Sequence, residues 1–310
     1  MRVGLIALLV LFTASGAAQE PAPARPDPIA LGEDPTQRMT VPVSVGDRGP
    51  YRFIVDTGSE RTVIARELAR DLGLSDGPAA TMFSMTEQSR VETVVIPGLE
   101  VGRRRVGRIH APALERRHLG AEGLLGVDAL QSQRVEVDFM RGEMTVLPAR
   151  RREEEWPADT IVVTARSRYG RLMLVDSELD GERIYVIVDT GAEVTIGNEE
   201  LRRRLERRGR LGPLEPVELQ SVTGGRLLAD SGIARRIRIG GAALRNLPVA
   251  FADAEPFRQL RLHDRPALLL GMDALRLFER VSFDFANRRV RLFVGGRSRR
   301  DGDPLRLAAR

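Results

Sequence analysis

The sequence predicts an all-β protein of two homologous lobes related by pseudo-twofold symmetry, because one pattern of segments occurs twice. Three matches come in the same order in both halves: Asp-Thr-Gly at 56–58 and 189–191, Leu-Leu-Gly at 124–126 and 269–271, and an apolar-Asp-Phe tripeptide at 137–139 and 283–285. The offset grows from 133 residues (189 − 56) to 146 (284 − 138), as loop insertions in the second copy would produce. We infer an internal duplication.

The local patterns favour β-hairpins with short helices in each copy. Alternating and apolar runs separated by turns predict two hairpins, one from 39–45 and 51–55 and the other from 172–175 and 184–188, the latter across a turn at 180–182. β-branched runs bounded by Gly or Pro predict further strands at 91–96 and 233–239. After each Asp-Thr-Gly a short helix is expected, at 65–72 and at 199–205, the second with Asn198 as its N-cap.

These boundaries divide the chain into six segments. They are a signal peptide at 1–18, a Pro/Ala-rich linker at 19–36, an N-terminal lobe at 37–148, a charged linker at 149–160, a C-terminal lobe at 161–295 and an Arg-rich tail at 296–310. With 310 residues, each lobe is long enough to bury a core of its own.

The charge balance does not indicate a nucleic-acid partner. The net charge of +5 comes entirely from arginine, because the chain contains no lysine, and the arginines alternate with acidic residues, as in 202–208. Aromatic residues make up only 5% of the chain, which leaves few side chains on which bases could stack. We therefore expect an arginine-rich surface and no nucleic-acid binding.

Residue types also restrict the chemistry. The absence of cysteine excludes disulfides, thiol nucleophiles and thiolate metal sites. The three histidines, His110, His118 and His263, are not spaced as metal ligands, and the sequence has no phosphate-binding glycine loop or dinucleotide motif. We expect no metal and no cofactor.

The first residues predict export. Arg2 precedes an apolar run at 3–12, and small residues follow up to Ala18, as in a signal peptide cleaved after that residue. The run is too short to serve comfortably as a permanent membrane span, although an uncleaved anchor remains an alternative. The protein is thus expected to be periplasmic or secreted in a bacterium.

Each Asp-Thr-Gly motif carries a carboxyl group at the end of an apolar strand. Burial there raises the pKa of Asp56 and Asp189, since the charged form loses solvation. The glycine permits a sharp turn and close approach of another chain, and the threonine hydroxyl can bind a neighbouring backbone group. One such motif alone would equally fit a tight turn. Two copies in equivalent positions place both carboxyls at the pseudo-twofold axis, where they would share one proton.

These motifs resemble those of retropepsin-like aspartic peptidases, in the clan that includes the pepsins. The resemblance rests on Asp-Thr-Gly-Ser/Ala followed by Leu-Leu-Gly-x-Asp-Ala-Leu, and it covers most of 37–148 and 167–295. The short lobes resemble the bacterial members, whereas two lobes on one chain resemble pepsins. The resemblance implies the bilobal acid-protease fold, with β-barrel-like lobes in a pseudo-dimeric monomer. Pairing of each lobe with its counterpart on a second chain remains an alternative.

The resemblance also implies the roles of the motif residues. Asp56 and Asp189 would be the catalytic dyad, in which the ionised carboxyl accepts a proton from water and the protonated one supports the substrate carbonyl. Thr57 and Thr190 would interlock beneath the dyad, with the two Leu-Leu-Gly segments packed under the loops. The supporting residues are Thr57, Gly58, Ser59, Thr190, Gly191 and Ala192. Glu60 and Glu193 are read as solvated charges at the loop ends.

Family members close a β-hairpin flap over the substrate, and two turns are candidates for it. Their substrate-binding residues would be Met85, Thr86, Val222, Thr223, Gly224 and Gly225. The second turn has paired glycines and is the better candidate, whereas the first is expected to be rigid or shortened. Neither carries the flap tyrosine of pepsins, and an ordinary surface hairpin remains an alternative for each.

The expected activity is that of an aspartic endopeptidase acting on peptides or exposed protein segments. Two alternatives stay open: a catalytically silent peptide-binding module of the same fold, and a structural protein that uses two β-lobes as a scaffold. Retention of an aspartate in both motifs favours the enzyme over either alternative.

Overall fold

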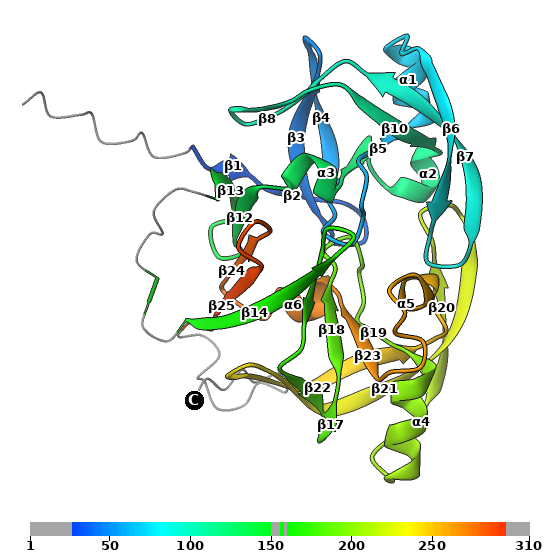
Figure 1. Ribbon diagram of the computed structural model, residues 1–310, viewed down its shortest axis with the longest axis vertical. Helices are drawn as coiled ribbons and strands as arrows, with labels where there is room; N and C mark the ends of the chain where they lie inside the picture. The colour runs from blue at the N-terminus through cyan, green and yellow to red at the C-terminus, as the bar shows by residue number, and fades with distance from the viewer. Residues whose placement is uncertain (1–26, 150–155, 158–159, 296–310) are drawn as a thin grey trace, which may run out of the picture.

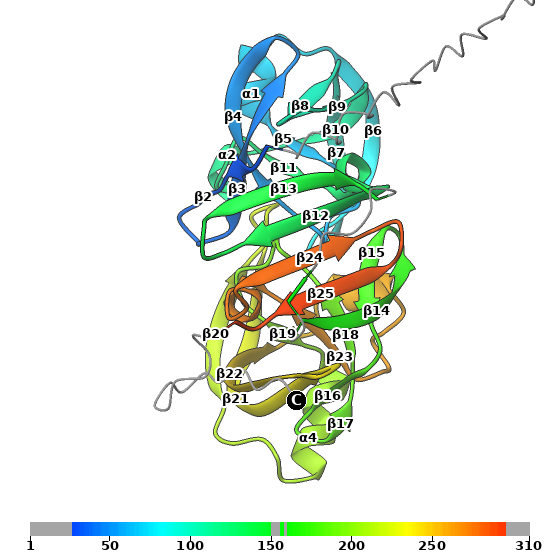
Figure 2. The same cartoon turned by 90° about the vertical axis from the view of Figure 1, so that its left-hand side faces the viewer.

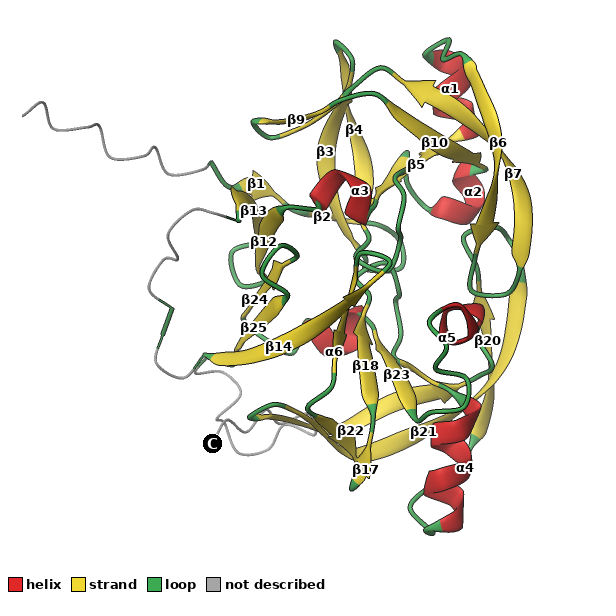
Figure 3. Ribbon diagram, viewed as in Figure 1, coloured by secondary structure: helices red, strands yellow, loops and turns green. Residues whose placement is uncertain are grey.

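The computed structural model describes residues 27–149, 156–157 and 160–295 and consists mainly of β-strands in two lobes, with a few short helices (Figures 1 and 3). The all-β prediction is confirmed. The predicted signal peptide, the Arg-rich tail and most of the charged linker lie outside the described residues. Among the residues described, no helix has both the length and the apolar character needed to cross a membrane.

The first lobe is built on one ten-stranded sheet. Its strands are β2 (Gly32–Glu33), β3 (Met39–Val45), β4 (Arg48–Val55), β5 (Val63–Ala65), β6 (Asp76–Phe83), β7 (Gln88–Ile96), β8 (Leu99–Val101), β9 (Arg104–Val106), β10 (Ile109–Leu114) and β11 (Gly123–Leu125). Its helices are α1 (Arg66–Asp71), α2 (Arg116–Leu119) and α3 (Val127–Leu130). The hairpin predicted from 39–45 and 51–55 is the antiparallel pair β3 and β4.

The second lobe repeats this plan with longer loops. Its strands are β14 (Ile161–Arg168), β15 (Arg171–Leu174), β16 (Ser177–Leu179), β17 (Glu182–Arg183), β18 (Tyr185–Val188), β19 (Ile196–Gly197), β20 (Glu215–Gln220), β21 (Arg226–Ile239), β22 (Ala242–Phe251), β23 (Ala267–Leu270), β24 (Arg280–Asp284) and β25 (Arg289–Phe293). Its helices are α4 (Glu199–Arg207), α5 (Glu255–Gln259) and α6 (Met272–Leu275).

The second predicted hairpin differs in detail from the structure. β15 and β18 pair antiparallel as expected, but the turn at 180–182 belongs to a separate small hairpin, β16–β17, inserted between them. Asp180 and Gly181 both have positive φ angles, of 45° and 78°, as a two-residue hairpin turn requires. The Asp180 carboxylate accepts the backbone N–H groups of Arg235 and Arg236, which attaches this hairpin to β21.

The helices predicted after each motif are α1 and α4. The Asn198 side chain caps α4 as predicted, because its Oδ1 accepts the N–H of Leu201 at 2.9 Å. Its Nδ2 also donates to the carbonyls of Leu262 and Arg265, so the cap connects the helix to the loop before β23.

A shared sheet joins the lobes on the side shown in Figure 2, where β13 (Glu143–Pro148), β12 (Gln133–Asp138), β24, β25 and β14 lie one after another. β12 from the first half pairs antiparallel with β24 from the second, with Val135 opposite Phe283 and Val137 opposite Val281. At its edge, β1 (Ile29–Ala30) pairs with β13, so part of the predicted linker at 19–36 forms strand. The two lobes are therefore held together by continuous backbone hydrogen bonding.

The Leu-Leu-Gly segments lie directly beside the strands that carry the aspartates. β11 runs parallel to β4, and β23 runs parallel to β18. The Asp56 N–H donates to the Leu125 carbonyl at 3.0 Å, and the Asp189 N–H donates to the Leu270 carbonyl at 3.1 Å. The backbone N–H of each aspartate is thus still hydrogen-bonded to the neighbouring strand. This bond fixes the position of the Cα atom from which the carboxyl side chain extends.

Candidate active site

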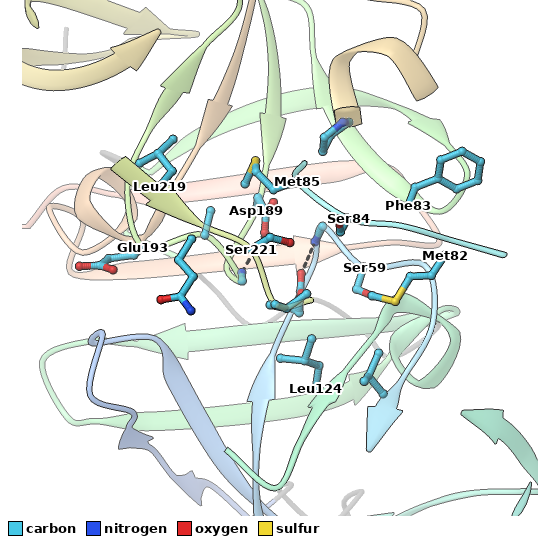
Figure 4. Close-up of a pocket in the computed structure, with 18 of the residues that line it drawn as sticks. Ser59, Met82, Phe83, Ser84, Met85, Leu124, Asp189, Glu193, Leu219 and Ser221 are labelled. Carbon is cyan, nitrogen blue, oxygen red and sulfur yellow. Dashed lines mark hydrogen bonds between the residues drawn. The ribbon is translucent and has the colours of Figure 1, made fainter. Parts of the chain in front are cut away.

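The aspartates of the two lobes line the same cleft of about 540 Å³, in which Figure 4 shows Asp189. Asp56 is buried and Asp189 is partly buried. A Cβ atom at Gly58 would overlap the carboxyl group of Asp189, and a Cβ at Gly191 would overlap that of Asp56. Each glycine therefore lies against the carboxyl of the opposite lobe, and a larger residue in either loop would push the pair apart.

Backbone donors orient both carboxyls in the same way. The N–H of Gly58 donates to Oδ1 of Asp56, and the N–H of Gly191 donates to Oδ1 of Asp189, each at 2.9 Å. The Ser59 N–H of the first loop also bonds to the Asp56 carboxyl, and the two carboxyls are hydrogen-bonded to each other. The local structure of the two loops is the same in both lobes, as the repeated sequence predicts.

Thr57 and Thr190 interlock beneath the dyad. The N–H of each threonine donates to the hydroxyl of the other, at 3.0 and 3.1 Å. The Thr57 hydroxyl in turn donates to the Val188 carbonyl at 3.0 Å, and the Thr190 hydroxyl donates to the Val55 carbonyl at 2.6 Å. Both side chains are buried, so these four bonds connect the two loops without competition from water.

Burial raises the pKa of both aspartates. For Asp189 the pKa rises to about 7, first because of burial and second because of the negative charge of Asp56. For Asp56 burial again raises the pKa, against the opposing effects of the Gly58 N–H and the positive charges of Arg38 and Arg171. Two carboxyls this close titrate as one pair, which holds a single proton over a range that extends to near-neutral pH.

The raised pKa of Asp189 predicts a pH-dependent stability. Because its folded-state pKa lies above the ordinary value of 3.8, its contribution to stability is complete below about pH 4 and is lost as the pH rises through about 7. Asp189→Asn removes this penalty and is expected to raise the free energy of unfolding by about 4 kcal/mol near pH 8. Thermal unfolding followed from about pH 4 to 8 measures the effect. The exposed turn residue Asp47 provides the control Asp47→Asn, and a gain at pH 4 as large as that at pH 8 would contradict the assignment.

Two buried arginines, missed by the sequence analysis, connect the loops to the opposite lobes. Arg171 Nε donates to the Gly58 carbonyl at 2.6 Å, and Arg38 Nη1 donates to the Gly191 carbonyl at 3.5 Å. Their offset is 133 residues (171 − 38), the same as that of the two aspartates. The shared offset could have identified the two arginines in the sequence as equivalent residues of the duplicated lobes.

Both predicted flaps reach across the cleft to the opposite lobe, as the right-hand side of Figure 1 shows. The hairpin β6–β7 reaches α5, whose residue Glu255 donates its N–H to the Met85 carbonyl at 3.0 Å. The hairpin β20–β21 reaches α2, where Gly224 lies directly against the ring of His118. The tips also touch each other, since Gly225 lies against Thr86.

The expectation that the first flap is shortened is therefore wrong. β6 and β7 have eight and nine residues and pair antiparallel from Asp76 opposite Val94 to Phe83 opposite Gln88, which makes a full hairpin. Of the predicted flap residues, Met85 and Val222 line the cleft, whereas the remaining four make the tip contacts or turns: Thr86, Thr223, Gly224 and Gly225. Gly224 adopts a φ of 89°, which favours glycine.

Several of the other residues singled out in the sequence also line the cleft. Ser59 and Ala192 line the cleft, as do Glu60 and Glu193. Of the histidines, only His118 lines the cleft, so the structure gives His110 and His263 no place in it. Within the described residues, no group of three or more His, Asp or Glu side chains is placed to hold a metal ion.

Two stretches of the chain, residues 41–129 and 175–274, match the family model described as aspartyl protease. The chain belongs to the aspartyl protease family. Each stretch contains one Asp-Thr-Gly and one Leu-Leu-Gly segment, so the retropepsin-like resemblance holds for both lobes of this aspartyl protease. No curated protein matches the sequence.

Proposed function

We propose that this aspartyl protease is an endopeptidase that hydrolyses peptide bonds with a water molecule activated between Asp56 and Asp189. The observation that carries the proposal is the crossed contact of the motifs, in which Gly58 lies against the carboxyl of Asp189 and Gly191 against that of Asp56. This contact brings one carboxyl from each lobe together at the floor of an open cleft. The cleft has a volume of about 540 Å³, and residues of both flaps line it.

In this mechanism the two carboxyls have opposite roles at any moment. The ionised member accepts a proton from the water, whose oxygen attacks the peptide carbonyl carbon. The protonated member donates a hydrogen bond to the carbonyl oxygen, where negative charge develops. Collapse of the tetrahedral intermediate breaks the C–N bond, and the amine leaves with a proton supplied by the dyad. No covalent bond to the enzyme forms at any step.

The substrates we propose are peptides or exposed protein segments outside the cytoplasm. The signal-like first residues support this location. The apolar lining of the cleft supports binding of apolar side chains next to the scissile bond, with Met82, Met85, Leu124 and Leu219 among the residues that line it.

Turnover of a mixed peptide library by the purified protein tests this function. We expect internal cleavage, detected by mass spectrometry, that a statine-type transition-state mimic suppresses. The rate is expected to fall as the pH rises above about 7, because Asp189 then loses the proton that the dyad needs. A folded protein that binds the peptides and leaves them intact would instead support the catalytically silent binding module.

A further inference from the structure

The two ends of the cleft are built from equivalent positions that carry different charges. The residues after the first motif are Glu60 and Arg61, and those after the second are Glu193 and Val194; all four line the cleft. Figure 4 shows Ser59, just before the first pair, and Glu193 on opposite sides of Asp189. We call the two sides the Arg61 end and the Glu193 end.

At the Arg61 end the acidic residue is neutralised and the basic one is free. Glu60 lies 3.8 Å from a guanidinium nitrogen of Arg171 and accepts a hydrogen bond from Gln259 at 3.2 Å. Arg61 is exposed, and its guanidinium has no ion-pair partner among the described residues. This end therefore presents one uncompensated positive charge to the cleft.

At the Glu193 end the same backbone gives the opposite result. Arg38 is the counterpart of Arg171, but it donates to the Asp34 carboxylate from Nε at 3.0 Å and from Nη2 at 2.6 Å. Glu193 is consequently left exposed without an ion-pair partner in the described part of the chain. Because Val194 replaces arginine at the next position, this end presents one uncompensated negative charge.

The remaining charged residues of the cleft do not cancel this difference. Glu218, the other carboxylate of the lining outside the dyad, is paired with Arg226 at 3.2 Å. The lining also has an apolar residue from each flap, Met82 from the first and Leu219 at the equivalent place in the second, on opposite sides of Asp189 in Figure 4. The backbone is thus pseudo-symmetric, whereas the charge changes sign from one end to the other.

We infer that the two ends of the cleft select oppositely charged side chains of a peptide substrate. The preferred substrate carries an acidic side chain that reaches Arg61 and a basic side chain that reaches Glu193, on either side of an apolar pair at the scissile bond. When the two side chains are exchanged in a peptide that keeps its backbone direction, each meets a residue of like charge, which weakens binding. The inference rests on the proposed peptidase function and adds the charge pattern of its substrates.

Two isomeric peptides test the inference. Both contain the same apolar scissile pair, and they differ only in that glutamate and arginine exchange places at the two flanking positions; a third peptide carries glutamine at both. For the wild type, kcat/KM is expected to differ about tenfold between the isomers, with the neutral peptide in between. The difference should shrink at about 1 M salt, since both ion pairs are exposed.

The charge-reversed variant Arg61→Glu/Glu193→Arg is expected to prefer the other isomer. Its matched control is Arg105→Glu/Glu100→Arg, which exchanges an exposed ion pair of 3.0 Å on β8 and β9 outside the cleft and should keep the wild-type preference. Both variants preserve the net charge. Equal kcat/KM for the two isomers with the wild type would overturn the inference, as would a preference that the reversal leaves unchanged.

Failure of the proposed function gives a different result. If the wild type cleaves none of the three peptides, the peptidase function is wrong, and the inference is then decided by binding alone. The dissociation constants of the same peptides for the Asp56→Asn variant, measured by fluorescence anisotropy, should show the same preference between the isomers. Equal constants would overturn the inference independently of turnover.

Discussion

Asparagine in place of either Asp56 or Asp189 is expected to lower kcat/KM by at least about 10³-fold. An amide cannot accept the proton of the attacking water, and it cannot exchange a proton with its partner carboxyl during the two halves of the reaction. Both single variants should lose activity to a similar extent, because the crossed contacts give the two carboxyls equivalent places. This equality distinguishes a shared dyad from a mechanism with one essential carboxylate.

The double variant sharpens the same experiment. Since either substitution alone disables the pair, Asp56→Asn/Asp189→Asn should be no slower than the single variants, which is strongly non-additive behaviour. Asp47→Asn, in the exposed turn between β3 and β4, should keep wild-type kinetics. A dyad variant that retains a tenth of the wild-type kcat/KM while folded would contradict the mechanism.

The features of the site that could be predicted from sequence are those that both copies repeat with the same residues. Asp56 and Asp189 follow matching apolar strands, and the Leu-Leu-Gly segments recur at a similar spacing, so the pattern alone placed both loops at one axis. The structure puts those segments where the pattern indicates, with the Leu125 and Leu270 carbonyls accepting the N–H groups of the aspartates.

The features that could not be predicted depend on contacts between the lobes. Arg38 and Arg171 stand among many other arginines in the sequence, and only folding shows that both guanidinium groups reach the opposite loop. The partner of each also differs, because Asp34 lies close to Arg38 whereas Gln259 lies close to Arg171, at 2.5 Å. A local sequence pattern does not show which residues far apart in the chain come into contact after folding.

The flaps show a second limit of sequence patterns. The paired glycines at 224–225 favoured the second turn as the better flap candidate, with the first expected to be rigid or shortened. In the structure the two hairpins are matched in reach, and the first is fixed by a backbone hydrogen bond from Glu255 to Met85. Hairpin length follows from strand pairing across many residues, so the composition of a turn does not determine it.

Valine in place of Thr57 is expected to lower the free energy of unfolding by about 2–5 kcal/mol, because it removes a hydroxyl that makes two bonds between the lobes. The substitution keeps the shape of the side chain but leaves the Val188 carbonyl and the Thr190 N–H without this partner, both at a buried position. Each buried polar group that loses its bond costs about 1–3 kcal/mol. Thr190→Val should have a similar effect, through the Val55 carbonyl and the Thr57 N–H.

Thr57→Ser is the matched control, because it keeps the hydroxyl and removes only a methyl group. Chemical denaturation of the valine and serine variants should therefore give a small loss for serine and a large one for valine. The double variant Thr57→Val/Thr190→Val should lose less than the sum of the single variants, since each valine already disrupts the bonds that the other residue makes. Valine and serine variants of equal stability would show that the packing of this pair, and not its hydrogen bonds, joins the two Asp-Thr-Gly loops.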